Sequence, residues 1–408
     1  MKVITDLRRI RELTDSRFID KIYPSAAKLE ETLRLGRRLT IYWGADPTAL
    51  DLHLDHSNAL FILREFQKLG HKAIFLIGDF TGRIGDPTDR LNPRPSLSDK
   101  EISKNAQNLK KQASKILDFN SKNNPAEVKF NSQWLKKLNL ADILGLTANF
   151  THAQLIERDM FERRIKEKKV IRVPELFYPL LQGYDSVAMG ADVEIGGTDQ
   201  TFNMLVGRRL VRIYRHKEKF VITKPILANP KTGGQLMSKS AGNYISLGAS
   251  APEMYGKLMA LPDEVITRAL ELWTFYPQKE IDKLKTALKK KTINPRDAKR
   301  ILALEVTKIY HGAVRASAAA REFSRVFKEK ETPQRIPQIK VKRGSMGVIE
   351  LIVKGGLASS KSEATRLVKQ GGVRVNQKSV SDPKFIIKLP TNGVLLQVGK
   401  RKFLRIKK

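Results

Sequence analysis

The sequence predicts an α/β protein that begins with a doubly wound parallel sheet and continues into a helical segment and a small basic α+β module. Apolar strands at 39–44 and 73–78 flank a helix at 57–69. A strand, a helix and a strand within about forty residues form a βαβ unit, which requires parallel strands. From residue 250 to 328 the pattern is almost entirely helical.

The other elements follow in chain order. Residues 6–36 read as helical, with a fresh helix beginning at Pro24. Further strands are predicted at 128–131, 192–195 and 220–226, and helices in the second half of 91–118 and at 176–184. In the tail, Ser360 and Glu363 form a capping box that opens a helix ending at Gly371-Gly372, and a strand follows at 373–375.

Composition shifts divide the chain into four predicted segments. The sheet domain covers 1–228, and a loop with the helical domain covers 229–331. A linker at 332–341 is marked by Thr332-Pro333 and Ile336-Pro337. The basic module covers 342–408.

Composition excludes several classes of protein. Hydrophobic residues make up 41% of the 408 residues, which is enough for a real core. The absence of cysteine excludes disulfides and every cysteine-based metal site. No apolar run reaches the ~20 residues that a membrane span needs, and the first residues lack a signal-peptide core. We therefore expect a cytoplasmic protein with no membrane contact.

The charge points to a polyanionic partner. Lys and Arg number 76 against 42 Asp and Glu, a net charge of +34. Residues 342–408 alone carry 16 basic and 3 acidic residues. Such an excess favours nucleic acid, although a solvated basic surface with no specific partner is the simpler alternative.

Residues 42–56 carry the first candidate site. They follow a strand and open a helix, and the carboxyl end of the first parallel strand is where such sheets bind nucleotides. Free N–H groups and the helix dipole favour phosphate there. Thr48, His53 and His56 can donate hydrogen bonds to phosphate oxygens. The alternative is a capped helix with two surface histidines.

The second candidate stretch is 236–243, beside Gly233-Gly234. The glycines allow a mobile loop, and Lys239 would bring a point charge to a phosphate. Taken alone, a flexible loop with one lysine is common.

Together the two stretches resemble the HIGH and KMSKS signatures of class I aminoacyl-tRNA synthetases. Residues 81–87, 178–185 and 196–200 resemble the amino-acid pocket of the tyrosyl-tRNA synthetase family. The tail at 351–382 resembles an S4 RNA-binding domain. The resemblance implies a Rossmann-like catalytic domain in 1–228 with tyrosine and ATP sites, an anticodon-side helical domain in 229–331 and an S4-like domain in 342–408.

It also implies an activity and its partners. L-tyrosine and ATP would give tyrosyl-adenylate and pyrophosphate, and the tyrosyl group would pass to the 3′ end of tRNA(Tyr). Mg²⁺ is expected to accompany ATP, with no metal held by the protein itself, and the protein is expected to be a homodimer. The nearest alternative is the tryptophanyl relative. A second alternative is a non-catalytic RNA-binding paralogue.

The resemblance assigns roles to individual residues. The catalytic assignments, which stabilise the departing pyrophosphate, are Thr48, His53 and Lys239. The tyrosine-binding assignments are Tyr42, Asp86, Tyr178, Gln182 and Asp185, with Asn131 as a weaker one that could simply be a turn former. The ATP-binding assignments are Gly44, Asp46, His53, His56, Gly197, Asp199, Gln200 and Lys239. The RNA-binding assignments are Lys361, Arg366, Lys369 and Arg374.

Specificity is expected to rest on Tyr42 and Asp185, which match the residues that bind the phenolic hydroxyl of the substrate. Phenylalanine would leave both without a partner. Core packing is the commoner fate of tyrosines such as Tyr42 and Tyr178. Positions 178, 182 and 185 nevertheless share one helix face, which favours a functional role.

Two residues depart from the family pattern. Asp55 replaces the glycine between the signature histidines, and Leu236 replaces the first lysine of the loop. Asp55 adds negative charge near phosphates, so we expect weaker ATP binding than in an Asp55→Gly variant, unless the side chain turns outward toward the helix N-terminus. Because the cation at 236 is lost, Lys239 should contribute more of the charge that stabilises the departing pyrophosphate.

Overall fold

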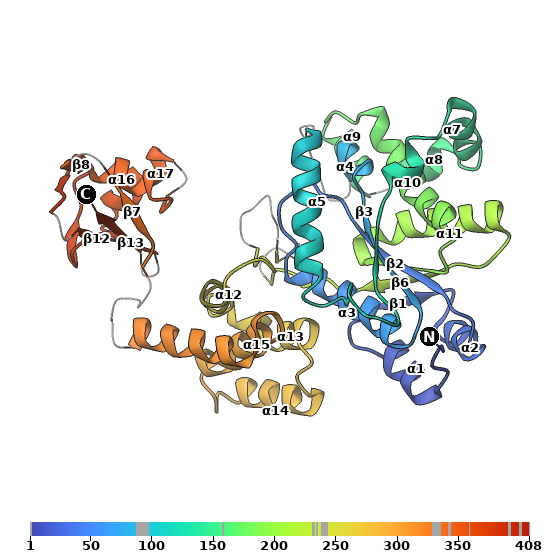
Figure 1. Cartoon of the computed structure of the whole chain (residues 1–408), viewed down its shortest axis with the longest axis horizontal. Helices are drawn as coiled ribbons and strands as arrows, with labels where there is room; N and C mark the ends of the chain where they lie inside the picture. Colours follow the sequence, from blue (N-terminus) through green and yellow to red (C-terminus); the bar gives the residue numbers. More distant parts are fainter. Residues whose placement is uncertain are drawn as a thin grey trace. The chain divides into compact units, whose positions relative to one another are not determined.

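The computed structural model describes residues 2–86, 98–156, 159–230, 233, 236–237, 244–328, 336–341, 344–358, 360–390, 393–399 and 402–407. The chain divides into two compact units, Met1–Ala320 and Arg321–Lys408, each with its own core (Figure 1). No helix in these ranges combines the length and apolar character that crossing a membrane requires.

The first unit is built on a six-stranded sheet with the order β1-β6-β5-β2-β3-β4. The pairs β2–β3, β2–β5, β3–β4 and β5–β6 are parallel, and β1 is antiparallel to β6. The strands are β1 (Lys21–Tyr23), β2 (Thr40–Ala45), β3 (Lys72–Ile77), β4 (Glu127–Phe130), β5 (Val193–Gly197) and β6 (Phe220–Lys224). This arrangement confirms the predicted doubly wound α/β fold.

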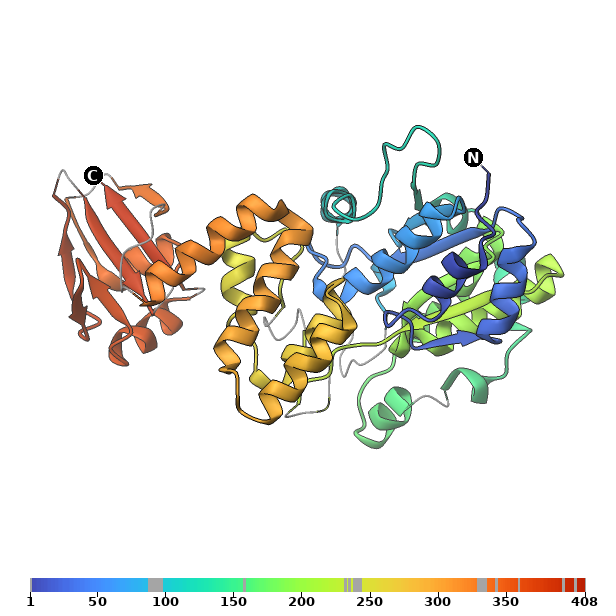
Figure 2. The same cartoon turned by 90° about the horizontal axis from the view of Figure 1, so that it is seen from below.

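Helices cover both faces of this sheet. α3 (Leu54–Lys68) lies on one face, and α10 (Val173–Met189) packs closely with α11 (Thr201–Arg215) over the other (Figures 1 and 2). The remaining helices before residue 230 are α1 (Leu7–Thr14), α2 (Ala26–Arg34), α4 (Thr81–Ile84), α5 (Asp99–Ala113), α6 (Ser132–Leu135), α7 (Leu140–Thr147), α8 (His152–Ile156) and α9 (Asp159–Lys166). Strands covered on both faces bury nearly every side chain, which explains why β3 and β5 are continuous apolar runs apart from Lys72 and Glu194.

The predicted helical segment is also present. It contains α12 (Ala251–Leu258), α13 (Ile266–Trp273), α14 (Gln278–Lys289) and α15 (Pro295–Lys328), which is interrupted at Gly312, where φ is 78°. The buried Trp273 and Leu270 on α13 belong to the core of this segment.

The chain reverses its direction of winding between β2 and β5. Strands β3 and β4 extend the sheet on one side of β2, while β5 and β6 extend it on the other. In open α/β sheets, ligands bind outside the carboxyl ends of the strands at such a switch point. The fold therefore places a binding site where β2 and β5 end.

The prediction that residues 6–36 are helical throughout is wrong at β1. Lys21–Tyr23 forms an edge strand that pairs with Val221–Thr223 of β6. This pairing joins segments about 200 residues apart, so no local pattern reports it. The following helix α2 is capped by Ser25, whose hydroxyl accepts a hydrogen bond from the Lys28 N–H, so it does not begin at Pro24. Of the predicted segment 91–118, residues 91–97 lie outside the described residues.

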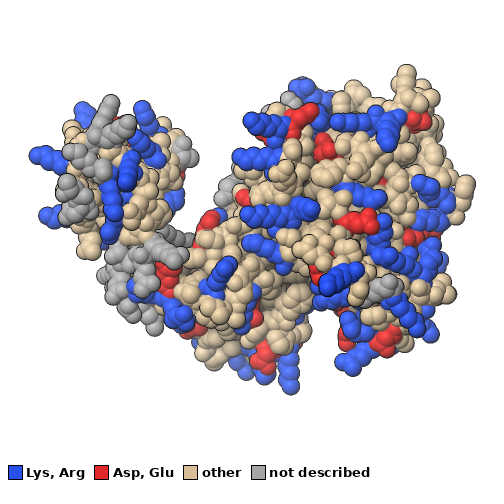
Figure 3. Space-filling model, in the orientation of Figure 1, with Lys and Arg blue, Asp and Glu red and all other residues tan. Residues whose placement is uncertain are grey.

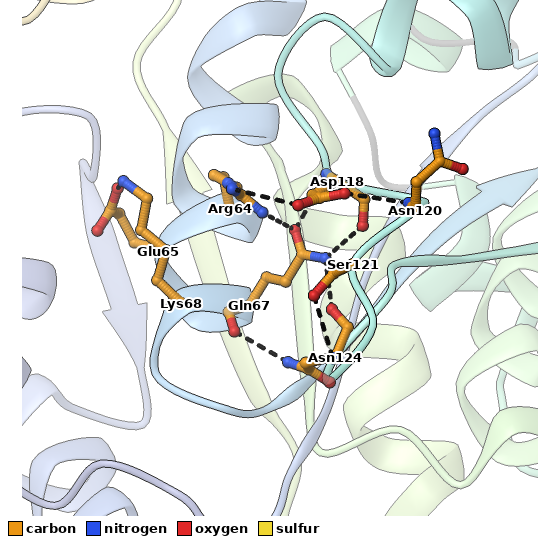
Figure 4. Close-up of polar contacts among 8 residues, drawn as sticks. All are labelled: Arg64, Glu65, Gln67, Lys68, Asp118, Asn120, Ser121 and Asn124. Carbon is orange, nitrogen blue, oxygen red and sulfur yellow. Dashed lines mark hydrogen bonds and ion pairs between the residues drawn. The ribbon is translucent and has the colours of Figure 1, made fainter. Parts of the chain in front are cut away.

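A buried amide anchors the end of α3. Gln67 Nε2 donates to the carbonyls of Asp118 (2.7 Å) and Asn124 (2.8 Å), and Arg64 donates to Gln67 Oε1 (2.7 Å) (Figure 4). Asn124 in turn donates to the carbonyls of Gln67 (2.9 Å) and His71 (2.8 Å). Asn124 thus satisfies one carbonyl in the last turn of α3 and the carbonyl of His71, just before β3 begins.

His71 lies in this region and is expected to make stability depend on pH. Its Nδ1 accepts the Leu39 N–H at 3.2 Å, and burial lowers its pKa from 6.5 to about 4. A depressed pKa contributes stability above the unfolded value of 6.5, and that stability is lost as pH falls toward 4. The free energy of unfolding should therefore fall by about 3 kcal/mol over this pH range. Urea unfolding between pH 4 and 7.5 should show it.

The control for this prediction is His71→Asn, whose side-chain oxygen can replace the Nδ1 acceptor without titrating. Its free energy of unfolding should vary less with pH than that of the wild type. Substitution of the exposed His216 by Asn should leave the wild-type slope intact. Equal slopes for wild type and His71→Asn would contradict the assignment.

The second unit is a small α+β module. Its five-stranded sheet has the order β10-β9-β12-β13-β7, and a two-stranded sheet joins β11 and β8. The strands are β7 (Gln338–Lys340), β8 (Ser345–Gly347), β9 (Val373–Val375), β10 (Lys378–Val380), β11 (Ile386–Lys388), β12 (Val394–Val398) and β13 (Lys402–Lys407), and the helices are α16 (Val348–Lys354) and α17 (Lys361–Lys369). Ser360 caps α17 through the Glu363 N–H, as predicted.

Candidate active site

The end of β2 brings two predicted groups of residues together. Asp46 follows Ala45, and its carboxylate accepts hydrogen bonds from Thr81 Oγ1 (2.7 Å) and from the Tyr178 hydroxyl (2.9 Å). Gly44 lies exposed at the same edge. An assigned ATP-binding residue, Asp46, thus contacts an assigned tyrosine-binding residue, Tyr178.

Asp185 is the centre of a buried polar cluster. Its side chain accepts hydrogen bonds from Trp134 Nε1 (2.7 Å) and Asn131 Nδ2 (3.3 Å), and the residue is 2% exposed. Burial raises the pKa of Asp185 well above its ordinary value, against the opposing effect of these two donors. A buried carboxylate that already accepts two donors is suited to accept a third from a ligand hydroxyl.

Tyr42 faces the same region. It packs in one buried cluster with Trp134, the donor to Asp185, and its hydroxyl lies 2.7 Å from Ser186 Oγ. Burial raises the pKa of Tyr42 well above 10, and the carboxylates of Glu194 and Asp185 raise it further. Tyr42 therefore keeps its proton and can act as a hydrogen-bond donor.

A chain of amides links the other predicted tyrosine-binding residues. Gln182 Nε2 donates to Glu194 Oε1 (3.1 Å), and Asn203 Nδ2 donates to the side-chain oxygens of both Gln182 and Gln200 (3.0 Å each). Gln200 Nε2 donates to Asp86 Oδ2 (2.6 Å). Gln182, Gln200 and Asp86 thus lie along one continuous network.

The start of α3 carries the two signature histidines. His53 is the N-cap residue, and its backbone N–H donates to His56 Nδ1 (3.0 Å), with the ring centroids 3.9 Å apart. Because His56 Nδ1 accepts this hydrogen bond, Nε2 is the ring nitrogen that carries a proton and can donate. Thr48 is half-buried, close to Gly82 at the start of α4.

β5 ends in a pair of glycines. Gly196 and Gly197 complete the strand, and Asp199 lies in the short 3₁₀ helix at Thr198–Gln200. Asp199 and Asp55 both act on the buried Lys224, whose pKa is lowered by burial and raised by these two carboxylates. The assigned residues Gly197, Asp199 and Gln200 therefore lie at the carboxyl end of β5, across the switch point from Gly44 and Asp46.

Asp55 does not turn outward. It is 4% exposed, and its Oδ1 accepts a hydrogen bond from Trp273 Nε1 of α13 (3.0 Å). Burial raises its pKa, although Lys224 and Trp273 act in the opposite direction. The outward orientation considered from the sequence is wrong, because the indole of Trp273 offers the carboxylate a buried donor.

The Asp55→Asn variant separates the charge of this side chain from its contact. Asn keeps an acceptor for Trp273 but removes the negative charge, so ATP binding should tighten on the order of fivefold. Isothermal titration with ATP measures this effect. Asp55→Gly should also bind ATP more tightly, but with lower stability toward urea, because Trp273 Nε1 loses its acceptor. Unchanged ATP affinity in both variants would show that the carboxylate does not act on the triphosphate.

The second signature is only partly described. Lys239 lies outside the described residues. Leu236 is 6% exposed, and its backbone N–H donates to the Leu227 carbonyl (2.8 Å). An apolar side chain fits this buried position, which gives a physical reason for leucine at the family's first lysine position.

Several residues of the cluster were missed from the sequence: Trp134, Ser186, Glu194, Asn203 and Lys219. Thr81 stood in the pocket motif at 81–87 but was given no role of its own. Glu194 had one signal, since it stands between Val193 and Ile195 in a strand whose other side chains are apolar or absent. A charged residue at a buried strand position requires a partner. Asn131, weakly assigned from the sequence, is buried and contacts Asp185, so it is more than a turn former.

The sequence matches the family of class I tRNA synthetases (W and Y) over residues 34–328 and the S4 domain over 349–391. The fold and the site therefore define a class I tRNA synthetase. The tyrosine–tRNA ligase of Thermotoga maritima is 44% identical over 94% of this chain and 94% of its own. That of Moorella thermoacetica is 46% identical over 93% and 91%. The chain belongs to the tyrosine–tRNA ligase family.

Solved structures agree on the fold. Tyrosyl-tRNA synthetase from Archaeoglobus fulgidus, complexed with L-tyrosine, has a TM-score of 0.60 at 22% identity and covers 76% of this chain and 99% of its own. A C-terminally truncated mitochondrial tyrosyl-tRNA synthetase from Aspergillus nidulans has a TM-score of 0.63 at 23% identity and covers 78% and 94%.

Proposed function

We propose that this chain is an ATP-dependent tyrosine–tRNA ligase. It activates L-tyrosine with ATP to tyrosyl-adenylate and pyrophosphate, and then transfers the tyrosyl group to the 3′ end of tRNA(Tyr). The observation that carries the proposal is the buried Asp185, held by Trp134 and Asn131 beside Tyr42. A buried carboxylate beside a phenol donor is what recognition of a phenolic hydroxyl requires.

The first step needs positioning and charge stabilisation rather than a protein nucleophile. A carboxylate oxygen of tyrosine forms a bond to the α-phosphorus of ATP, and the bond to the β-phosphate breaks in line with it. In the second step a hydroxyl at the tRNA 3′ end attacks the carbonyl carbon, and AMP departs.

The triphosphate is proposed to lie across the start of α3. His56 Nε2 offers a donor there, and the helix N-terminus favours anions. Thr48, His53 and Lys239 would stabilise the departing pyrophosphate, and Gly44 and Gly197 would line the nucleotide at the carboxyl ends of β2 and β5. We also propose that Mg²⁺ accompanies ATP as part of the substrate. The described residues contain no group of three or more His, Asp or Glu that could hold a metal ion.

Tyrosine is proposed to lie with its phenol between Tyr42 and Asp185. The α-ammonium group would be held by Tyr178, Gln182 and Asp86. The Tyr178 side chain is held there by its hydrogen bond to Asp46. The side chains of Gln182 and Asp86 are held by hydrogen bonds to Asn203 and Gln200.

ATP–pyrophosphate exchange with each of the twenty amino acids tests the proposal. We expect exchange with tyrosine alone. Exchange with tryptophan instead would support the tryptophanyl alternative. No exchange with any amino acid, together with tRNA binding, would support a non-catalytic RNA-binding protein in which Asp55 and Leu236 mark a lost ATP site.

The C-terminal unit is proposed to bind tRNA. Its visible face carries many Lys and Arg side chains and almost no acidic ones (Figure 3). The assigned residues on α17 and β9 are all exposed: Lys361, Arg366, Lys369 and Arg374. Exposed cations on one small unit are suited to contact phosphates.

Changing these four residues to alanine should weaken tRNA binding and its dependence on salt. Each lost phosphate contact lowers the slope of log K against log salt by about one unit. Filter binding from 50 to 300 mM KCl measures the slope. A control with four exposed basic residues of α1 and α2 changed to alanine should keep the wild-type slope: Arg8, Arg9, Lys28 and Arg34. Equal slopes in both variants would remove the four residues from the RNA contact.

We also propose a homodimer working in the cytoplasm, where tRNA is charged. Exposed apolar side chains support the dimer: Leu140 (74% exposed) and Leu144 (60%) on α7, Val170 (66%) before α10, and Val173 (64%) at its first residue. Exposed apolar side chains of this size mark interaction surfaces when they are contiguous.

The predicted roles of segments 1–228, 229–331, 332–341 and 342–408 remain part of this proposal.

A further inference from the structure

Two charged side chains are fully buried behind the proposed tyrosine site. Lys219, just before β6, is 0% exposed, and Glu194 on β5 is 2% exposed. They form an ion pair, and Lys219 Nζ also donates to Ser186 Oγ (2.8 Å) and to the Met204 carbonyl (3.3 Å). All three protons of the ammonium group are thereby used.

The space for this ammonium group is built by glycine. A Cβ atom at Gly207 of α11 would lie 2.7 Å from Lys219 Nζ and 3.2 Å from Ser186 Oγ. Any larger residue at 207 would displace the lysine or the serine. The close approach of α10 and α11 therefore leaves a place that fits the lysine head group.

The pair contacts both ends of the proposed tyrosine site. At the phenol end, Ser186 Oγ accepts a hydrogen bond from Lys219 and donates one to Glu194 Oε2 (3.3 Å). The same Oγ lies 2.7 Å from the Tyr42 hydroxyl, where either oxygen can be the donor. Lys219 and Glu194 thereby fix the serine that the Tyr42 hydroxyl contacts. At the ammonium end, Glu194 Oε1 accepts a hydrogen bond from Gln182 (3.1 Å).

We propose that Glu194 and Lys219 are positioning residues that fix Tyr42 and Gln182 together and so set the preference for tyrosine over phenylalanine. This inference rests on the proposed function, because it takes Tyr42 and Gln182 as contacts of the amino acid. Glu194 and Lys219 themselves touch no substrate. They act by holding the donor of Tyr42 and the amide of Gln182 in one orientation.

Lys219→Met tests the inference, since methionine has a similar length and no donor. The kcat/KM for tyrosine in pyrophosphate exchange should fall by about 10- to 100-fold. The kcat/KM for phenylalanine and the KM for ATP should change by less than threefold, so the preference for tyrosine narrows. A matched control is Lys217→Met, two residues earlier, where the lysine pairs with Asp192 instead. The control should keep the wild-type preference.

The double variant Glu194→Gln with Lys219→Met distinguishes a role in positioning Tyr42 and Gln182 from a role in the stability of the fold. Replacing a buried ion pair by uncharged residues of similar size often preserves stability, whereas removing one partner does not. We expect the double variant to regain the thermal stability that Lys219→Met loses without regaining the tyrosine preference. Recovery of both would show that the pair only supports the fold, and this would overturn the inference.

Failure of the inference can be told apart from failure of the proposed function. If wild-type protein gives no exchange with tyrosine, the proposed function fails. If the wild type exchanges tyrosine and Lys219→Met keeps its preference for tyrosine over phenylalanine within threefold, only the positioning role fails. In Ser186→Ala the preference should also narrow, and combining it with Lys219→Met should add little, because both act through Tyr42.

Discussion

Replacing Asp185 with asparagine is expected to lower kcat/KM for tyrosine in pyrophosphate exchange by about 30- to 150-fold. Hydrogen bonds to a charged group contribute about 2–3 kcal/mol, and the phenol of the substrate would lose its charged acceptor. The asparagine side chain keeps one acceptor oxygen but places its NH2 group opposite either Trp134 Nε1 or Asn131 Nδ2, which are donors themselves. The effect should appear mainly as a raised KM for tyrosine, while the KM for ATP stays unchanged.

The matched control is Asp192→Asn, another buried aspartate. Asp192 accepts hydrogen bonds from Arg37 (3.0 Å), Lys217 (2.8 Å) and the Thr40 N–H (2.8 Å), just before β5 begins and far along the strand from its carboxyl end. Its substitution should lower stability toward urea but leave kcat/KM for tyrosine within threefold. If Asp185→Asn behaved like this control, Asp185 would be a structural residue and the tyrosine assignment would lose its main support.

The parts of the fold that were predictable are those with local signals. The βαβ unit was found because apolar runs and a helix ending before Gly70 lie next to one another in the chain. The capping serine of α17 was found for the same reason. β1 was missed because its three residues gain their partners only from β6. Pairing between distant segments leaves no periodicity in either one.

The site shows the same division. Tyr178, Gln182 and Asp185 were grouped by their spacing on one helix face, and α10 does carry all three. Their partners are Asp46, Glu194 and Trp134, which come from three other parts of the chain. Spacing identifies residues that share a helix face, but the groups that orient them are brought in by tertiary packing.

The second large effect is expected at Lys239. Lys239→Ala should slow tyrosyl-adenylate formation by about 10²- to 10³-fold, because removing one positioned donor from developing negative charge has a cost of this size. The family's first lysine position is occupied here by Leu236, which is buried and apolar. No second lysine at that position can therefore help Lys239 to stabilise the departing pyrophosphate. The rate is measured by single-turnover quenched flow with saturating ATP and tyrosine.

The loss at Lys239 should leave tyrosine affinity within twofold of wild type, because the charge is needed only as pyrophosphate departs. Lys257→Ala on α12 is the control, since Lys257 pairs with Glu253 on the surface and should not affect the rate. Lys239→Arg should recover part of the rate, because it restores the charge but not the point-like head group. A rate for Lys239→Ala within a few-fold of wild type would remove Lys239 from the reaction, and the stabilisation of pyrophosphate would then have to come from Thr48, His53 and the start of α3.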